Sequence, residues 1–274
     1  MTGVVYLVGA GPGAPDLLTL RAARLLERAD VVFHDALVPK EILVLASKAR
    51  KVEVGKRSGR HSTAQLFINK RLVDAARKYK VVVRLKGGDP MLFGRASEEI
   101  SYLKKCRIRF EIIPGVTAAL AAAADLGVSL TARGLSRSVA FITTRAAAGA
   151  PPNNWLQAAL AADSVAIYMG AGEAAGISRA LLAAGKSPAT PVVIVECASL
   201  PGVRRLSGTL QQLPQLAARC GSGPAVILLG EVYRDAAASN IMAPWLSERP
   251  SGGQSSSSPT ARATRRGRAR SSNS

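Results

Sequence analysis

Residues 4–13 read VVYLVGAGPG, an unbroken apolar run that ends in a glycine-rich turn. A short apolar run bounded by glycines is typical of a buried strand in an open α/β sheet, where the turn after the strand meets a ligand. Three further motifs contain glycine or charged residues and follow apolar runs: VGKRSGRHS at 54–62, KGGDP at 86–90 and FGR at 93–95. Their order and spacing predict an enzyme with one small-molecule site.

Strand-like and helical patterns alternate along the chain on both sides of these motifs. In the first part we expect strands at 4–8, 31–33, 51–54, 81–85 and 111–113, and helices at 17–28, 64–78, 97–105 and 117–125. Asp16 is the expected cap of the first helix. After residue 130 the pattern restarts, with strands at 139–143, 165–169, 192–196 and 225–230, and helices at 155–161, 174–183 and 213–218.

This alternation predicts an α/β protein of two domains, each a mainly parallel sheet flanked by helices. The turn at Pro114 and Gly115 suits a linker, so we expect an N-terminal domain over 1–114 and a C-terminal domain over 115–235. A ligand is then expected in the cleft between the two domains.

Composition narrows the class of protein. With 274 residues, 48% of them hydrophobic, the chain is long enough for two modest cores. No apolar run approaches the roughly 18 residues of a membrane span, and no basic segment precedes the first apolar run, which predicts a cytoplasmic protein. The three cysteines are scattered and there are only two histidines, so neither a disulfide framework nor a metal site is expected.

The positive charge is divided between a tail and the body of the chain. Residues 236–274 are rich in Ser, Gly, Pro, Ala and Arg and predict a disordered tail; with six Arg against one Glu, this segment contributes +5 of the net +19. The remaining +14 favours an acidic small-molecule substrate or a polyanion such as RNA. Because several basic residues lie inside the motifs, we expect this charge to have a function and not only to solvate the surface. Of the two kinds of partner, the nucleic acid is the one that we do not expect.

The first motif has a second interpretation. Gly9, Gly11 and Ala14 fit the dinucleotide-binding pattern, and an acidic residue, Asp35, follows about 20 positions later, as in an NAD-dependent oxidoreductase. However, Pro12 and Pro15 lack the N–H groups that a pyrophosphate would need at the start of a helix. A tight turn that requires glycine dihedrals explains the motif equally well.

Taken together, the motifs resemble those of the uroporphyrinogen-III C-methyltransferases, from residue 4 to about 233. The GPG, GGDP and PGVT segments are shared with the wider tetrapyrrole methylase group, whereas VGKRSGRHS followed by Gln65, and FGR followed by Glu98 and Glu99, point to the uroporphyrinogen enzymes. The resemblance implies a homodimer of two-domain chains with S-adenosylmethionine in the cleft. It also implies methylation of uroporphyrinogen III at C2 and C7 through precorrin-1 to precorrin-2, in sirohaem or cobalamin biosynthesis, with S-adenosylhomocysteine as the by-product.

The resemblance assigns roles to charged residues. It implies that Asp35 accepts a proton and that Lys56 donates one or orients the substrate, with Arg95 as a third catalytic residue. Arg57, Glu98 and Arg133 are implied substrate contacts. A cleft lined by cations suits a polycarboxylate substrate, and the residues expected to line it are Lys56, Arg57, Arg60, Arg84, Lys86, Arg95 and Arg133. Asp35 could instead cap a helix or turn, although its place at the carboxyl end of a strand favours the active role. Arg95 with Glu98 could instead form a surface ion pair.

The cofactor contacts also come from the resemblance. Glycines after a strand allow a ligand to approach the backbone, although GGD could equally be only a turn, and Met169 alone would more often be core filler. The implied contacts with S-adenosylmethionine are Pro12, Gly87, Gly88, Asp89, Leu92, Thr117, Ala118, Met169 and Ala198.

The chain departs from the family pattern at several positions. Ala14 stands where an acidic residue is usual, Ala132 where a histidine is common, and Cys197-Ala198-Ser199 where a glycine-bearing turn is usual. Asp35, Lys56 and GGD are all retained, which favours an active enzyme. The alternatives are a related tetrapyrrole or ribosomal RNA methyltransferase, a catalytically degenerate paralogue, and a non-catalytic basic binding protein.

Overall fold

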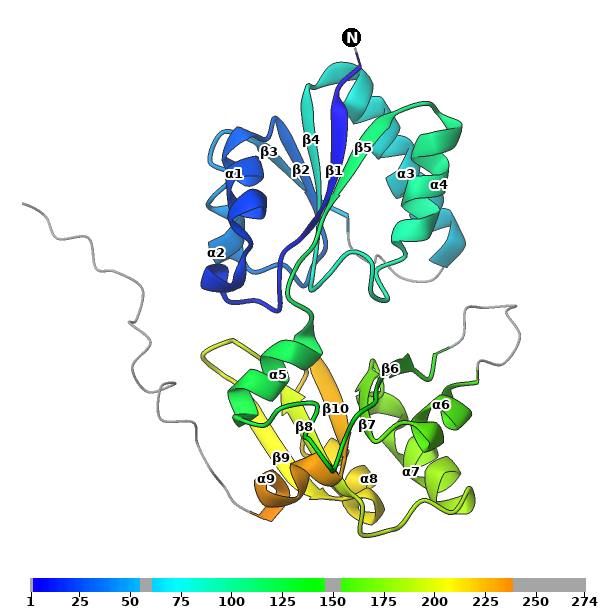
Figure 1. Cartoon of the computed structure of the whole chain (residues 1–274). Coiled ribbons are helices and arrows are strands. Elements are labelled where there is room, and N and C mark those ends of the chain that lie inside the picture. Colours follow the sequence, from blue (N-terminus) through cyan, green and yellow to red (C-terminus); the bar gives the residue numbers. More distant parts are fainter. Residues whose placement is uncertain (1, 55–60, 146–153, 239–274) are drawn as a thin grey trace, which may run out of the picture. The chain divides into compact units, whose positions relative to one another are not determined.

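The computed structural model describes residues 2–54, 61–145 and 154–238 (Figure 1), which belong to one compact unit, Met1–Ala243. Strands and helices alternate along the described residues, so the predicted α/β class is confirmed. The domain boundary at 114/115 stays a prediction. Among the described residues, no helix combines the length and apolar character needed to span a membrane.

The first sheet is parallel throughout, as predicted. Its strands lie in the order β3-β2-β4-β1-β5, and every neighbouring pair is parallel. Its strands are β1 (Val4–Gly9), β2 (Val31–His34), β3 (Arg50–Glu53), β4 (Val81–Lys86) and β5 (Arg109–Ile113). The neighbours β1 and β4 lead into helices on opposite faces of the sheet. Their carboxyl ends therefore flank a topological switch point, where open α/β sheets bind ligands.

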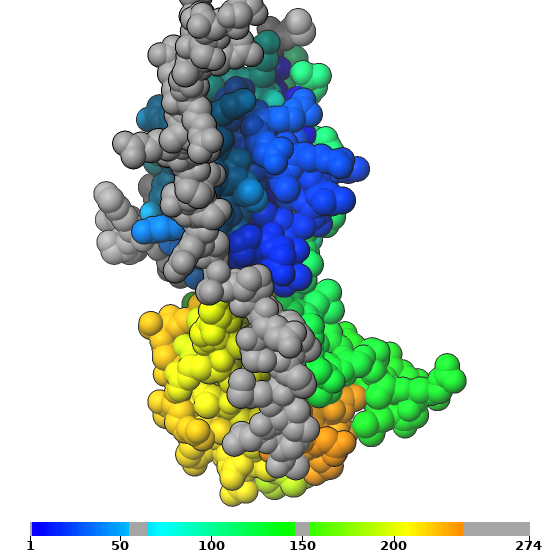
Figure 2. Space-filling model, turned by 90° about the vertical axis from the view of Figure 1, so that its left-hand side faces the viewer, coloured from blue at the N-terminus to red at the C-terminus, as the bar shows by residue number. Residues whose placement is uncertain are grey.

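Helices cover both faces of this sheet, which explains the continuous apolar runs of the inner strands β1 and β2. The helices α1 (Leu20–Arg28) and α2 (Lys40–Leu43) lie on one face, and α3 (His61–Lys78) and α4 (Ala96–Lys105) lie on the other. Because side chains alternate along a strand, Leu7 packs toward α3 and α4 while Val8 packs toward α1. Figure 2 views the α1 and α2 side, where residues of this layer are coloured blue.

The start of α1 differs from the prediction. Residues Pro15–Leu17 form a 3₁₀ turn, η1, and α1 begins only at Leu20. The N-cap is Thr19, whose Oγ1 accepts a hydrogen bond from the Ala22 N–H at 3.2 Å, so Asp16 is not the cap. Pro12 and Pro15 have no backbone N–H, which favours a turn here, so the helix begins later along the chain.

The second sheet differs from the prediction in strand direction. Its strands are β6 (Val139–Thr143), β7 (Ser164–Tyr168), β8 (Pro191–Glu196), β9 (Arg204–Thr209) and β10 (Ala225–Gly230), in the order β6-β7-β10-β8-β9. Only β6 and β7 pair in parallel, and the other neighbours are antiparallel within the described residues. The expectation of a mainly parallel sheet is therefore wrong for this half, and β9 was not predicted. Residues 197–203 between β8 and β9 are too few for a parallel crossover.

Two layers of helices and turns cover the second sheet. On one face, α6 (Trp155–Ala161), α7 (Ala174–Ala183) and α8 (Leu213–Ala218) pack against the strands. The other face packs against α5 (Ala118–Leu126) and Tyr233. The 3₁₀ turns η2 (Ala171–Glu173), η3 (Leu210–Gln212) and η4 (Glu231–Tyr233) precede α7, α8 and α9 (Arg234–Ala238). The helix α9 ends at Ala238. The rest of the predicted tail, 239–274, lies outside the described residues, so the tail stays a prediction.

Candidate functional site

Two glycine loops meet at the switch point of the first sheet. The GAGPG loop follows β1 and the KGGDP loop follows β4, and backbone hydrogen bonds join them. The Gly88 N–H donates to the Gly11 carbonyl at 2.7 Å, and the Gly11 N–H donates to the Gly88 carbonyl at 3.2 Å. Both glycines have positive φ, 70° for Gly11 and 66° for Gly88, which favours residues without a Cβ. The two motifs thus form one backbone surface.

A third loop, after β5, packs on this surface. A Cβ on Gly115 would lie 2.4 Å from the Gly88 carbonyl oxygen and 2.9 Å from the Gly9 Cα. Asp89 fixes the contact: its Oδ2 accepts from the Gly115 N–H at 2.9 Å and its Oδ1 from the Met91 N–H at 2.7 Å. Asp89 therefore braces loops that lie 26 residues apart in sequence.

These loops form one wall of a cavity of about 470 Å³. This volume lies within the roughly 300–1,000 Å³ that small-molecule sites occupy. The opposite wall comes from the ends of β7, β8 and β10 in the second sheet, including Tyr168, Val195 and Val226. All nine predicted cofactor contacts line it: Pro12, Gly87, Gly88, Asp89, Leu92, Thr117, Ala118, Met169 and Ala198.

Tyr168 links the cavity to the start of α5. Its hydroxyl lies 2.7 Å from the Thr117 Oγ1 and accepts a hydrogen bond from the Ala119 N–H at 3.2 Å. Burial raises the pKa of Tyr168, which outweighs the lowering by these two hydrogen bonds, so the phenol is neutral at pH 7. The Phe93 ring packs on Tyr168 at a centroid distance of 5.1 Å. Tyr168 and Phe93 extend the site beyond the predicted residues.

Strained backbone gathers around the cavity. Phe93 and Met169 line it with φ values of 52° and 57°. Cys197 and Ser199, which flank Ala198, have φ values of 56° and 69°. Non-glycine residues held at positive φ cost free energy and cluster at ligand sites. The strain therefore marks the same region that the motifs indicate.

Two of the departures from the family pattern are in contact. The Ala14 N–H donates to the Ser199 Oγ at 3.1 Å, and the Ser199 N–H donates to the Asp125 Oδ2 at 2.6 Å. Ala14 is 4% exposed and lies outside the cavity lining. Ala14 and Ser199 therefore meet at one buried contact between the GAGPG loop and the β8–β9 connection.

Asp35 follows β2 at the same sheet edge and joins a buried cluster of charges. Its Oδ1 accepts a hydrogen bond from the Arg84 Nη2 at 2.5 Å, and its side chain is 32% exposed. The Arg84 Nε donates to Glu99 Oε1 at 3.0 Å, and the Lys86 Nζ lies 3.1 Å from both Glu99 oxygens. We call Asp35, Arg84, Lys86 and Glu99 the charge cluster.

The charge cluster corrects one expectation. Arg84 and Lys86 were expected to line an open basic cleft, but each is only 3% exposed and paired with Glu99. Burial would lower the pKa of Arg84, yet the carboxylates of Asp35 and Glu99 raise it overall. For Lys86, burial and then the Arg84 charge lower the pKa, and Glu99 offsets them only in part. These cations hold protein carboxylates instead of facing a substrate.

The other predicted site residues are less closely grouped. Arg95 and Glu98 form a two-point ion pair at the start of α4, with distances of 2.7 and 2.8 Å, on partly exposed side chains. This geometry is that of the surface ion pair considered above, and neither residue lines the cavity. Arg133 is exposed in the turn after α5. Lys56 and Arg57 lie outside the described residues.

Some cavity residues gave no usable pattern in the sequence. Phe93 is the first residue of the FGR motif and Tyr168 directly precedes Met169, a predicted cofactor contact, so these positions could have indicated them. The lining also includes Arg145 and residues 222–226. Nothing in their residue types marks them, because only the packing of β10 between β7 and β8 brings 222–226 to the cavity.

Comparison with known proteins places the fold and the site in context. Residues 4–214 match the family model of the Tetrapyrrole (Corrin/Porphyrin) Methylases. The uroporphyrin-III C-methyltransferase of Thermus thermophilus, solved with S-adenosylhomocysteine, is 40% identical with a TM-score of 0.75, covering 85% of this chain and 100% of that one. A cobalt precorrin-4 methyltransferase is 30% identical with a TM-score of 0.72, covering 84% and 95%.

Longer relatives contain a similar segment. The siroheme synthase of Psychrobacter cryohalolentis is 45% identical over 232 residues, which are 84% of this chain and 44% of that protein. The chain thus spans about half the length of the curated relatives it matches. With a family match over most of its length and the same two-sheet fold, the chain belongs to the tetrapyrrole methylase family.

Proposed function

We propose that this chain methylates uroporphyrinogen III at C2 and C7, by way of precorrin-1, to give precorrin-2 for sirohaem or cobalamin synthesis, with S-adenosylmethionine as the methyl donor. The observation that carries the proposal is the convergence of all nine implied cofactor contacts on one cavity. Family membership and the 40% identical methyltransferase support the same reaction. The three cysteines are unpaired, which suits a reducing compartment, and we place the reaction in the cytoplasm.

The cavity suits S-adenosylmethionine as the cofactor. A Cβ on Gly87 would meet only Leu37, at 3.7 Å, and one on Gly88 would come no closer than 4.0 Å to Thr117. The backbone of GGD thus borders open space that a ligand can fill. Apolar side chains such as Met169 and Val226 line the remaining walls and suit the apolar parts of the cofactor. When bound, the cofactor supplies a methyl group from its sulfonium.

Asp35 is the proposed proton acceptor. Arg84 holds its Oδ1, which leaves Oδ2 to take the proton that the pyrrole carbon loses on methylation. Arg84 pairs directly with the acceptor, whereas Lys86 pairs with Glu99 behind it. We propose that Lys56 donates a proton or orients the substrate. The other proposed contacts with the substrate are Arg57, Arg95, Glu98 and Arg133.

Methyl transfer itself provides the test. Purified protein is incubated with anaerobically generated uroporphyrinogen III and methyl-labelled S-adenosylmethionine, and we expect two labelled methyl groups per tetrapyrrole by mass. Transfer to ribosomal RNA instead would identify the RNA alternative. Cofactor binding without transfer would indicate another tetrapyrrole substrate, and loss of cofactor binding would indicate a degenerate paralogue.

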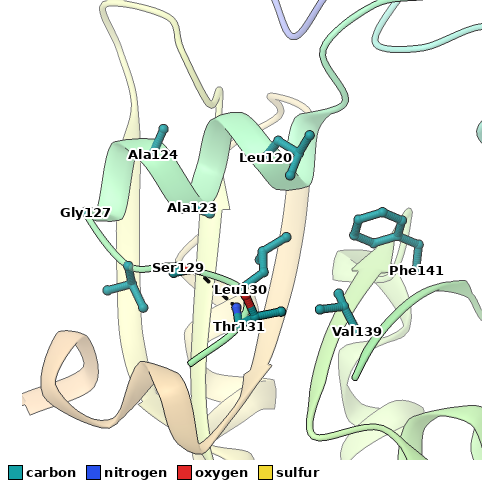
Figure 3. A pocket seen from close by; sticks show the side chains of 10 residues that line it. Leu120, Ala123, Ala124, Gly127, Ser129, Leu130, Thr131, Val139 and Phe141 are labelled. Carbon is teal, nitrogen blue, oxygen red and sulfur yellow. Dashed lines mark hydrogen bonds between the residues drawn. The ribbon is translucent and has the colours of Figure 1, made fainter. Parts of the chain in front are cut away.

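We also propose that the chain forms a homodimer through the surface beside α5. An apolar groove of about 510 Å³ lies between α5, the segment after it and β6 (Figure 3). Large apolar side chains are exposed on the elements around it: Leu120 by 50%, Leu135 by 53% and Phe141 by 37%. An apolar groove bordered by exposed apolar side chains suits a self-complementary contact between two copies.

Leu120→Arg is expected to convert the dimer to a monomer, because it places a charge in the apolar contact. Light scattering after size-exclusion chromatography measures the mass. Leu20→Arg, at a residue 76% exposed on α1, is the control and should leave the dimer intact. A native monomer, or a dimer that tolerates the Leu120 change, would refute this interface.

A further inference from the structure

The charge cluster contains one residue with no role in the chemistry described so far, Glu99. Its side chain is fully buried, with 0% exposure, on the first turn of α4. Its Oε1 accepts hydrogen bonds from Arg84 Nε at 3.0 Å, Lys86 Nζ at 3.1 Å and Gln65 Nε2 at 3.3 Å, and its Oε2 accepts from Lys86 Nζ at 3.1 Å. One carboxylate thus fixes two cations that come from β4.

Burial decreases in order along the cluster. Glu99 is 0% exposed, Arg84 is 3% exposed at the side chain, and Asp35, at the carboxyl end of β2, is 32% exposed. Arg84 bridges the inner and outer carboxylates, with Nε toward Glu99 and Nη2 toward Asp35. Because a guanidinium is planar and rigid, fixing one edge of it fixes the direction of the other.

Stability alone does not account for this arrangement. Removing charges from water is costly, and buried ion pairs are often no more stabilising than apolar side chains of similar volume. The α3 side chains that face the cluster, Gln65 and Asn69, are amides that hydrogen-bond each other at 3.0 Å and add no charge. Two carboxylates therefore balance two cations, and the only member that reaches solvent is the proposed proton acceptor.

We propose that Glu99 is a positioning residue for the methyl-transfer reaction: it orients the Arg84 guanidinium, which in turn fixes the Asp35 carboxylate. Arg84 is a single cation between two carboxylates, and Lys86 supplies the second positive charge that balances them. The inference rests on the proposed function for its catalytic part. The orientation of Arg84 by Glu99, however, is a property of the folded protein that is measurable without turnover.

The test is Glu99→Gln, which keeps the shape of the side chain and removes its charge. We expect kcat to fall about 10- to 100-fold, the usual cost of losing a supporting contact behind a reacting group. The dissociation constant for S-adenosylhomocysteine should stay within about two-fold, because Glu99 does not line the cavity. Arg84→Gln combined with Glu99→Gln should lower kcat no further than Arg84→Gln alone, since both changes break one connection.

Nitrogen NMR of the Arg84 side chain gives a readout independent of activity. In the native protein, the hydrogen bond to Asp35 should restrict rotation of the Arg84 Nη2 group. In Glu99→Gln this rotation should become faster although Asp35 is still present, because the guanidinium is no longer oriented. If the native protein transfers no methyl groups but the NMR result holds, the proposed function fails and the orienting role stands. Unchanged Nη2 restriction together with unchanged kcat would overturn the inference.

Two further variants separate positioning from folding. Glu99→Asp keeps the buried charge but shortens the reach to Arg84, so a folded protein with lowered kcat is expected even if Glu99→Gln fails to fold.

Asp30→Asn is the matched control at the other end of the sheet. There, Asp30 accepts from the Lys80 and Val81 N–H groups at 2.9 and 2.8 Å. Asp30→Asn should lower thermal stability and leave kcat and the Arg84 spectrum unchanged.

The double variant gives a further check. If the losses in kcat caused by Glu99→Gln and Arg84→Gln were fully additive, the two residues would act independently, which would contradict the inference.

Discussion

Replacing Asp35 by Asn is expected to lower kcat for methyl transfer about 100- to 10,000-fold, the usual contribution of a general acid or base. The amide keeps an oxygen that can accept from the Arg84 Nη2, now 2.5 Å from the Asp35 Oδ1, but it cannot take a proton. The fold and the cofactor cavity should therefore be preserved. Steady-state kinetics measures the loss, and titration calorimetry with S-adenosylhomocysteine checks that affinity stays within about two-fold.

The matched control for this change is Asp16→Asn, an exposed carboxylate in the η1 turn that does not line the cavity. It should retain the native rate. If Asp35→Asn also retained the native rate, Asp35 would not be the proton acceptor.

Gly115→Ala is expected to reduce cofactor affinity at least about ten-fold and to destabilise the fold by about 1–3 kcal/mol, as overpacking does. The new Cβ would lie 2.4 Å from the Gly88 carbonyl oxygen, which is backbone and has no side-chain rotamer through which to relieve the clash. Moving Gly88 breaks its paired hydrogen bonds with Gly11 and distorts the GGD loop that lines the cavity. Calorimetry with S-adenosylhomocysteine and thermal unfolding measure the two effects.

Gly176→Ala provides the comparison within the same chain. Gly176 lies inside α7, and a Cβ there meets nothing within 4 Å. Alanine in a helix interior is favoured over glycine by roughly 0.5–1 kcal/mol, so this variant should be slightly more stable and bind the cofactor normally. If Gly115→Ala and Gly176→Ala had the same thermal stability and the same affinity for S-adenosylhomocysteine, the close backbone approach at Gly115 would not shape the site.

Much of the fold was predictable because its determinants are local. The apolar run 4–8 and its GAGPG turn identified β1, and similar apolar runs identified β2 and β4. Pairing directions in the second sheet were not predictable from such runs, because a buried strand shows the same apolar pattern in either direction. The strand β9 was missed because RRLSGT has a single buried position, Leu206, and no alternation to indicate it.

The sequence by itself determined the α/β class and the glycine loops, because apolar runs, turn residues and motif spacing are properties of neighbouring positions. The resemblance of its motifs to a known family supplied nine residues that line the cavity. Only the tertiary structure decided what surrounds each charged group. Arg84 and Lys86 resembled cations of an open cleft, yet α4 places Glu99 against them and buries all three. Likewise, Ala14 and Ser199 meet across 185 positions. Burial and ion pairing depend on which distant elements pack together, and that information is absent from any short stretch of the chain.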